Sequence, residues 1–395
     1  MPSKAQYLSN LTPLRGIAAL LVAIFHFEMA IARFVPAAQT MFFEKCYLMV
    51  DLFFVMSGFI MLHVYGKDFS QSISKHLLRN FFVARFARIY PLHFFSTTLL
   101  IILVIVFSPV GMYPNAMQFP AAIPTNIFLL QSFYIHKIYT WNIPSWSISS
   151  EWAAYIIFPL LALFISRKRK LSIVVLIIFI VASYLSIMYL LPRKNPLYPS
   201  IPVPHNINTT YDYGFLRGIA GFITGMMMYL LYQSNKIKNI FSRDIFTFIA
   251  ILLLIAAMHF AINDGFCVIL FAGIVLCFGC NSGYVHKICN NRVLQYLGLI
   301  SYSIYLMQIF FQDPFSKGLR LPGVTGLGRG KQNIEFWNGL MYCIIYLLLL
   351  IAVSSITYYF IENPSRKFIN RKWGNKKFDN VMATNIYSAE PSSST

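Results

Sequence analysis

The chain alternates between apolar stretches of about 20 residues and short polar segments. Helices of that length cross the hydrocarbon core of a bilayer, and their internal hydrogen bonds satisfy the backbone there. The pattern predicts an all-α integral membrane protein with about ten transmembrane helices. These are expected at residues 14–34, 46–65, 91–110, 147–166, 171–191, 214–233, 244–262, 266–281, 294–313 and 337–361.

One further apolar stretch, at 119–135, is interrupted by Pro120 and Pro124. Proline lacks the backbone N–H that a helix needs and clashes with the preceding turn. We therefore expect a partly embedded loop at 119–135. An eleventh span there would reverse the direction of every helix that follows.

The composition agrees with a membrane protein, because 57% of the residues are hydrophobic and only 11% are charged. A soluble domain carries about a quarter charged residues. The net charge is +19, from 32 Lys and Arg against 13 Asp and Glu. With the amino terminus in the cytoplasm, 22 of the cations fall inside and 10 outside, as the positive-inside rule requires. Both termini are then cytoplasmic, and no nucleic-acid partner is needed to explain the charge.

The predicted organisation is one membrane domain at 1–365 followed by a basic cytoplasmic tail at 366–395. The tail carries six Lys and Arg residues and ends in Ser-Ala-Glu-Pro-Ser-Ser-Ser-Thr, a polar composition that predicts disorder. No metal site is expected. Cys277 and Cys280 have the spacing of a ligand pair but lie inside an apolar span without a second pair.

Ionisable side chains within apolar spans are costly to place there, so each is a candidate functional group. Arg15 and His26 in the first span are eleven residues apart, which puts them on one helix face about 16 Å apart along the axis. Arg15 lies at the cytoplasmic edge, where a guanidinium can hold phosphates. His26 lies near mid-membrane, where a neutral imidazole can act as a general base. The alternative is a snorkelling arginine and a histidine that bonds to a neighbouring helix.

Two more arginines, Arg85 and Arg88, precede the third span on one face of a helix that enters from the cytoplasm. Together with Arg15 they could form an anion site for a nucleotide-bearing donor. Ordinary positive-inside anchoring explains them equally well.

On the outer side, Asp51 opens span two, Glu151 opens span four beside Trp146, and Arg217 opens span six. These side chains could bind a polar acceptor, or the charged ones could pair with one another as buried ions. The chain has no P-loop, zinc-protease, serine-hydrolase or dinucleotide motif. ATP-driven transport, metalloproteolysis and hydride transfer therefore lack their machinery.

Several stretches together resemble acyltransferase family 3, membrane enzymes that modify surface and secreted carbohydrates such as O-antigen and exopolysaccharide. The resemblance runs through nearly the whole chain and includes the family's Arg-x10-His signature at Arg15 and His26. The other matching stretches are Asp51-Leu52-Phe53-Phe54-Val55-Met56-Ser57-Gly58-Phe59, Arg85-Phe86-Ala87-Arg88-Ile89-Tyr90-Pro91, Trp146-Ser147-Ile148-Ser149-Ser150-Glu151-Trp152, Phe215-Leu216-Arg217 with Gly225, Leu297-Gly298-Leu299-Ile300-Ser301-Tyr302-Ser303-Ile304-Tyr305-Leu306 and Ile361-Glu362-Asn363-Pro364.

The resemblance implies an acyl-CoA co-substrate, with acetyl-CoA the first candidate, and a glycan or lipid-linked glycan acceptor. Arg15 and His26 would be the catalytic pair, and Arg15, Arg85 and Arg88 would hold the phosphates of CoA. His26 would deprotonate the acceptor hydroxyl or form an acyl-histidine intermediate. Asp51, Glu151, Trp146 and Arg217 would face the acceptor. The expected location is a prokaryotic plasma membrane, with polysaccharide assembly machinery as a further partner.

Two features depart from the family pattern. A histidine often follows the Ser-Tyr-Ser-x-Tyr-Leu run, whereas this chain has Gln308. A glutamine side chain does not titrate, so only a hydrogen-bonding role is expected at this position. No esterase-like domain follows the last span, so a stand-alone form is expected.

Two other functional classes stay open on the residues alone. A transporter of a lipid-linked saccharide or an anion would use His26 and Glu151 as relay groups. A scaffold of an export complex would use the buried ions only to fix helix packing.

Overall fold

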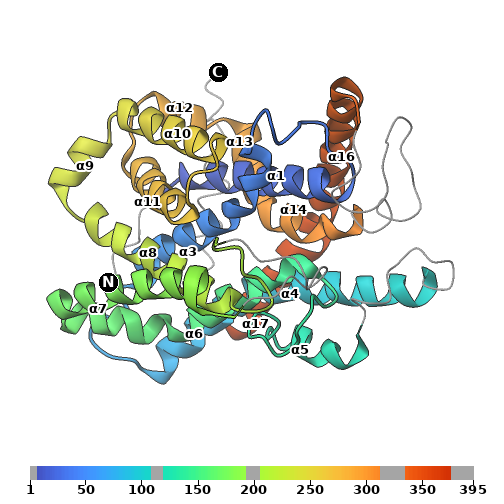
Figure 1. Cartoon of the computed structure of the whole chain (residues 1–395). Helices are drawn as coiled ribbons and strands as arrows, with labels where there is room; N and C mark the ends of the chain where they lie inside the picture. Colours follow the sequence, from blue (N-terminus) through green and yellow to red (C-terminus); the bar gives the residue numbers. More distant parts are fainter. Residues whose placement is uncertain (1–6, 108–118, 193–204, 312–333, 375–395) are drawn as a thin grey trace, which may run out of the picture.

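The computed structural model describes residues 7–107, 119–192, 205–311 and 334–374 (Figure 1). The described part is an all-helical bundle. The first half contains α1 (Leu11–Ala30), α2 (Phe42–Lys45), η1 (Cys46–Leu48), α3 (Met49–Tyr65), α4 (Lys75–Phe107), η4 (Pro120–Ala122), α5 (Ile123–Ile127), η5 (Ile143–Ser145), α6 (Trp146–Arg167), α7 (Arg169–Leu185) and η6 (Ser186–Leu190).

The second half contains α8 (Gly214–Tyr232), α9 (Asn235–Phe241), α10 (Asp244–His259), α11 (Asp264–Cys280), α12 (Tyr284–Cys289), α13 (Arg292–Leu299), α14 (Ser301–Met307), α16 (Phe336–Thr357), η7 (Tyr358–Glu362) and α17 (Asn363–Trp373). Among the described residues, seven helices are long and apolar enough to cross a membrane, and nine if two bent pairs each count as one span. α11 adds a shorter apolar helix. Each of the ten expected spans coincides with one of these helices or pairs, which confirms a fold of about ten helices.

The expected loop at 119–135 contains only η4 and α5, which are three and five residues long. The chain then turns irregularly, with left-handed backbone angles at Leu129 and Tyr134. Neither helix is long enough to span a bilayer, so the prolines stop the apolar stretch from becoming an eleventh span.

Two helices extend further than the sequence pattern predicts. α4 begins at Lys75, 16 residues before the expected start of span three, and is 33 residues long with Pro91 inside it. Arg85 and Arg88 therefore lie within the helix. α17 runs to Trp373 and packs against α4, so residues 366–373 of the expected tail are helical. The rest of that tail lies outside the described residues.

α1 and α3 run through the middle of the molecule, with α9 to α12 on one side and α4 to α7 on the other (Figure 1). Small residues allow the close approach of their neighbours. A Cβ atom at Gly58 of α3 would overlap the backbone of Phe222 on α8, and one at Gly225 of α8 would overlap the backbone of Val55. Gly298 meets the backbone of Thr12 in the same way. These contacts set α1 against α13 and α3 against α8.

Candidate active site

The residues with candidate chemistry gather in two charged groups at different depths of the bundle. We name the first, Arg15, Arg85, Arg88, Glu151 and Glu362, the inner arginine group. It contains the cations that the sequence assigns to the cytoplasmic end. We name the second, Lys45, Asp51, Arg217 and Asp264, the outer ion-pair group.

Arg88 and Arg85 of α4 have partners within the protein. Arg88 forms an ion pair with Glu362, and Glu362 also accepts a hydrogen bond from Ser303 Oγ at 2.8 Å. Arg85 is buried and donates to Tyr65 Oη at 3.0 Å. Both guanidinium groups are therefore held in place by neighbouring helices.

Arg15 differs from these two arginines. Its guanidinium lies within electrostatic range of Arg88, Glu151 and Glu362, yet among the described residues it has neither a hydrogen bond nor an ion pair. The side chain is only half-buried. The described part of the chain therefore supplies no acceptor for its donors, and anion binding by Arg15 stays a prediction.

Glu151 belongs to the inner arginine group and does not contact Asp51 or Arg217. Its carboxylate accepts hydrogen bonds from Ser57 Oγ at 2.8 Å and from the Tyr155 hydroxyl. The sequence analysis grouped Glu151 with Asp51 and Arg217 on the outer side. The rotation of α6 instead directs its carboxylate toward α3, at the level that Arg15 reaches from α1.

The inner arginine group carries an excess of positive charge. Three arginines face two glutamates, which leaves one net positive charge among these described residues. Arg366 of α17 lies within electrostatic range of Arg88 and Glu362 and raises the excess to two. The sequence analysis placed Arg366 in a disordered tail, because its helical packing against α4 has no signal in the local pattern.

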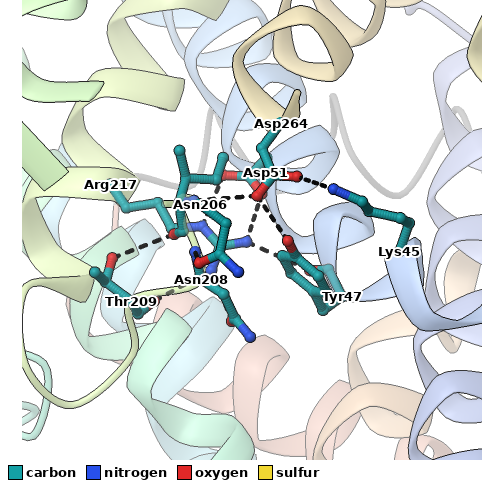
Figure 2. Close-up of polar contacts among 9 residues, drawn as sticks. Lys45, Tyr47, Asp51, Asn206, Asn208, Thr209, Arg217 and Asp264 are labelled. Carbon is teal, nitrogen blue, oxygen red and sulfur yellow. Dashed lines mark hydrogen bonds and ion pairs between the residues drawn. The ribbon is translucent and has the colours of Figure 1, made fainter. Parts of the chain in front are cut away.

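The outer ion-pair group is balanced in charge, and its polar contacts are drawn in Figure 2. Arg217 donates through Nε and Nη2 to the two oxygens of Asp51, at 2.9 and 2.5 Å, and both residues are 0% exposed. Lys45 pairs with Asp264 at 2.5 Å, and Asp264 also accepts from the Tyr47 hydroxyl at 2.6 Å. Two cations thus face two carboxylates.

The remaining donors of Arg217 reach backbone and amide oxygens. Nη1 donates to Thr209 O at 3.1 Å and Nη2 to Tyr47 O at 3.4 Å. The Trp146 ring lies 5.2 Å from the guanidinium. This geometry supports the buried-ion alternative for Asp51 and Arg217, whereas a direct contact of either with an acceptor stays a prediction.

His26 lies near the outer end of α1 and bonds to Gln308, which directly follows α14. His26 Nδ1 and Gln308 Oε1 are 3.2 Å apart. An amide oxygen only accepts hydrogen bonds, so this contact puts the proton on Nδ1 and the lone pair on Nε2. Gln308 has the hydrogen-bonding role expected from its departure from the family pattern.

α1 is one unbroken helix from Leu11 to Ala30, so Arg15 and His26 lie about 16 Å apart along its axis and on one face. The inner arginine group is at one end of this interval and the His26–Gln308 pair is at the other. An extended molecule with a polyanionic head and a reactive tail would fit such an arrangement.

Three functional contacts were missed by the sequence analysis: Ser57 and Tyr155 on Glu151, and Glu362 on Arg88. Glu362 had a signal in the Glu-Asn-Pro stretch that ends η7. No sequence signal distinguishes Ser57 and Tyr155 from packing residues, because their contacts with Glu151 depend on how α3 faces α6.

Comparison with known proteins identifies the family. A family model described as an acyltransferase domain matches residues 9–359. The chain is 34% identical over 168 residues to an acyltransferase, MdmB, of Streptomyces mycarofaciens, covering 40% of each chain. It is 21% identical over 398 residues to the peptidoglycan O-acetyltransferase OatA of Listeria monocytogenes, covering 92% of this chain and 57% of OatA.

The chain is also 40% identical over 88 residues to protein 2 in the picA locus of Rhizobium radiobacter, covering 22% of this chain and 40% of that protein. The matched stretches thus span between 40% and 57% of these relatives' lengths. No solved structure matches the chain significantly. The family match covers nearly every described helix, and on that ground the chain belongs to acyltransferase family 3, a family of membrane-bound acyltransferases.

Proposed function

We propose that this chain is a membrane-embedded O-acyltransferase. It moves an acyl group, with acetyl the first candidate, from acyl-CoA at the cytoplasmic side to a hydroxyl of a cell-surface or exported polysaccharide or its lipid-linked precursor. The family supports acyl transfer, and the name of the peptidoglycan O-acetyltransferase supports an acetyl group and a glycan acceptor. A prokaryotic plasma membrane and a contact with polysaccharide assembly machinery are parts of the same proposal.

The observation that carries the proposal is the guanidinium of Arg15, which has no hydrogen bond or ion pair among the described residues and belongs to a group with excess positive charge. A charged side chain within an apolar span is normally paired, and leaving it without a counter-ion is costly. The phosphates of CoA would supply the missing negative charge. Arg85 and Arg88, each fixed by its own partner, would add to the local positive potential.

The chemistry follows from the two ends of α1. With the phosphates at Arg15, the pantetheine arm of CoA is long enough to bring the thioester toward His26. His26 Nε2 takes the proton of the acceptor hydroxyl as the oxygen attacks the thioester carbonyl. The C–S bond then breaks, the acyl–oxygen ester forms, and His26 returns the proton to the CoA thiolate. In the alternative two-step route, His26 carries the acyl group before the hydroxyl attacks.

Gln308 would act as a positioning residue in this step. Its amide oxygen holds Nδ1–H of His26, so that Nε2 keeps the lone pair that a general base needs. Gln308 is completely buried, which restricts the motion of its side chain.

The test uses membranes that contain equal amounts of wild type, His26→Ala or Gln308→Leu. Each is incubated with radiolabelled acetyl-CoA, and label is followed into glycan and lipid-linked fractions. We expect His26→Ala to reduce transfer by about 10²–10⁴-fold. Gln308→Leu should reduce it by about fivefold, since one hydrogen bond is worth about 1 kcal/mol.

His259→Ala is the matched control, because His259 lies at the end of α10 and bonds to Thr40, and the proposed reaction does not use it. It should transfer label like the wild type. Equal transfer by wild type and His26→Ala would remove His26 from the mechanism. No transfer by the wild type from any acyl-CoA would contradict the proposed function and favour the transporter alternative.

A further inference from the structure

The helix α17 carries exposed basic and aromatic side chains that the proposed acylation chemistry does not use. The helix contains four Lys and Arg residues and no Asp or Glu. Three of these cations are exposed, and an exposed phenylalanine lies among them. We name this set the α17 row; its members are Lys367, Phe368, Arg371 and Lys372.

α17 has two different faces. The members of the α17 row are spaced by one, four and five residues, so they share one side of the helix. The opposite face packs against α4, and its cation Arg366 lies within electrostatic range of Arg88 and Glu362. Because the protein holds this inward face, the α17 row is directed away from the bundle.

The α17 row continues the exposed apolar side of the helix that precedes it. Residues 336–373 form one of the helices that are long and apolar enough to cross a membrane. Ile356, Phe360 and Phe368 are 58%, 77% and 56% exposed. The twelve residues from Ile356 to Phe368 include the π turn η7 and correspond to about three helical turns, so the three side chains lie on one side.

Along this side the chemistry changes at Phe368. The exposed side chains before it are apolar, whereas Lys372 follows one turn later, with Lys367 and Arg371 beside it. Apolar side chains face the acyl chains of a bilayer, and Lys and Arg collect where a helix reaches the cytoplasmic headgroups. The α17 row therefore lies where this side of the helix passes from acyl chains to headgroups.

The contacts within the row indicate the ligand. Lys372 Nζ lies 5.6 Å from the centre of the Phe368 ring and 4.8 Å from that of the Trp373 ring, so a cation and two aromatic rings form one surface. Tryptophan at the end of a membrane helix typically lies at headgroup level. A cluster of four or more cations directly cytoplasmic of a membrane helix is typical of contact with anionic lipids. Such lipids offer phosphate oxygens to the cations and acyl chains to the rings.

We propose that the α17 row binds the headgroups of anionic phospholipids in the cytoplasmic leaflet. Its three cations donate hydrogen bonds to phosphate oxygens, while Phe368 and Trp373 lie against the adjoining ends of the acyl chains. Because the opposite face of α17 carries Arg366, the same lipid contact holds this arginine near the inner arginine group. The inference concerns the bilayer, so it stands whether or not the chain transfers acyl groups.

The test measures which phospholipid lies beside Trp373. The full chain is placed in nanodiscs of phosphatidylcholine that contain a small fraction of brominated phosphatidylglycerol or, in a second sample, of brominated phosphatidylcholine. Bromine quenches tryptophan fluorescence at short range, and the contribution of Trp373 is the difference between each chain and its Trp373→Phe form. We expect quenching to be about fivefold stronger with brominated phosphatidylglycerol. This preference should largely disappear in about 0.5 M KCl, which screens the cations.

The triple variant Lys367→Gln, Arg371→Gln and Lys372→Gln should lose the preference for phosphatidylglycerol. Quenching of Trp373 by both brominated lipids should persist in it, because the aromatic side chains still reach the bilayer.

The matched control is the triple variant Lys236→Gln, Arg243→Gln and Lys287→Gln. It removes the same charge from exposed positions among α9 to α12, which lie on the other side of α1 and α3 from α4 (Figure 1). The control should keep the wild-type preference.

Three results would overturn the proposal. Equal quenching by the two brominated lipids in the wild type would show that α17 does not select headgroups. An unchanged preference in the α17 triple variant, or an equal loss in the control variant, would show that the α17 row is not the binding site. No quenching of Trp373 by either lipid would place the row away from the bilayer and favour an acidic protein as its partner.

Discussion

The inner arginine group and the outer ion-pair group both combine basic and acidic side chains on neighbouring helices, yet they differ in charge balance and in access. The outer group has two cations and two carboxylates, and the Asp51–Arg217 pair is 0% exposed. The inner group has more cations than carboxylates, and Arg15 is half-buried with no hydrogen bond or ion pair to the described part of the chain. The first arrangement is complete without a ligand, whereas the second is not.

This difference shows how a charged residue in an apolar span should be interpreted. A buried pair loses its hydration and recovers that cost only through good geometry and further hydrogen bonds. Arg217 meets this condition with two bonds to Asp51 and two to backbone oxygens. Arg15 does not meet it with the residues that the structure describes, which is the reason for the proposed anion site.

Arg217→Ala should have the largest effect on stability. It leaves the Asp51 carboxylate buried and unpaired, which typically costs about 3–5 kcal/mol. Thermal unfolding in detergent, followed by size exclusion, should show a strongly lowered midpoint. A midpoint within the error of wild type would mean that the outer pair does not stabilise the fold.

Replacing both partners should be far milder. In Asp51→Leu combined with Arg217→Met, no charge is left without its counter-ion, and apolar replacements of buried pairs are often neutral. The backbone oxygens that Arg217 bonded lose their donor, so we expect a loss of at most about 2 kcal/mol. The same unfolding assay measures it. A loss as large as that of Arg217→Ala would show that the pair does more than satisfy its own charges.

Raising the salt concentration should have a smaller effect still, and it should affect the inner arginine group and not the outer ion-pair group. The inner group is reached by solvent and is screened, because raising KCl to about 0.5 M shortens the Debye length to a few ångströms. Coenzyme A binding should weaken several-fold. The stability difference between wild type and Arg217→Ala should stay unchanged, since the outer pair is sealed. Equal salt dependence of both quantities would contradict this distinction.

The sequence predicted the features that local periodicity determines. Ten apolar stretches became helices, and the eleven-residue spacing of Arg15 and His26 holds because α1 is one unbroken helix. Prolines at 120 and 124 correctly marked a loop. The start of α4 at Lys75 was missed because its first turns are polar and amphipathic, with no long apolar run to mark them.

The partners of the site residues were harder to predict, because they depend on how helices rotate against each other. Glu151 bonds to Ser57 on α3, a contact that no spacing within α6 reveals. The segment around Trp141, whose backbone is left-handed, is irregular, and such a segment has no period from which facing side chains could be predicted. The charge balance of each group became visible only once the helices were assembled.

The most direct measurement of the central claim is coenzyme A binding by isothermal titration calorimetry on the purified chain in nanodiscs. Wild type, Arg15→Gln and the double variant Asp51→Leu with Arg217→Met are compared at equal folded amount. Arg15→Gln should raise the Kd by about 10–100-fold, because this change removes charge-assisted hydrogen bonds to phosphate. The Kd of the double variant should stay within about threefold of the wild-type value. Wild-type affinity in Arg15→Gln, or an equal loss in the double variant, would contradict the assignment of anion binding to the inner group.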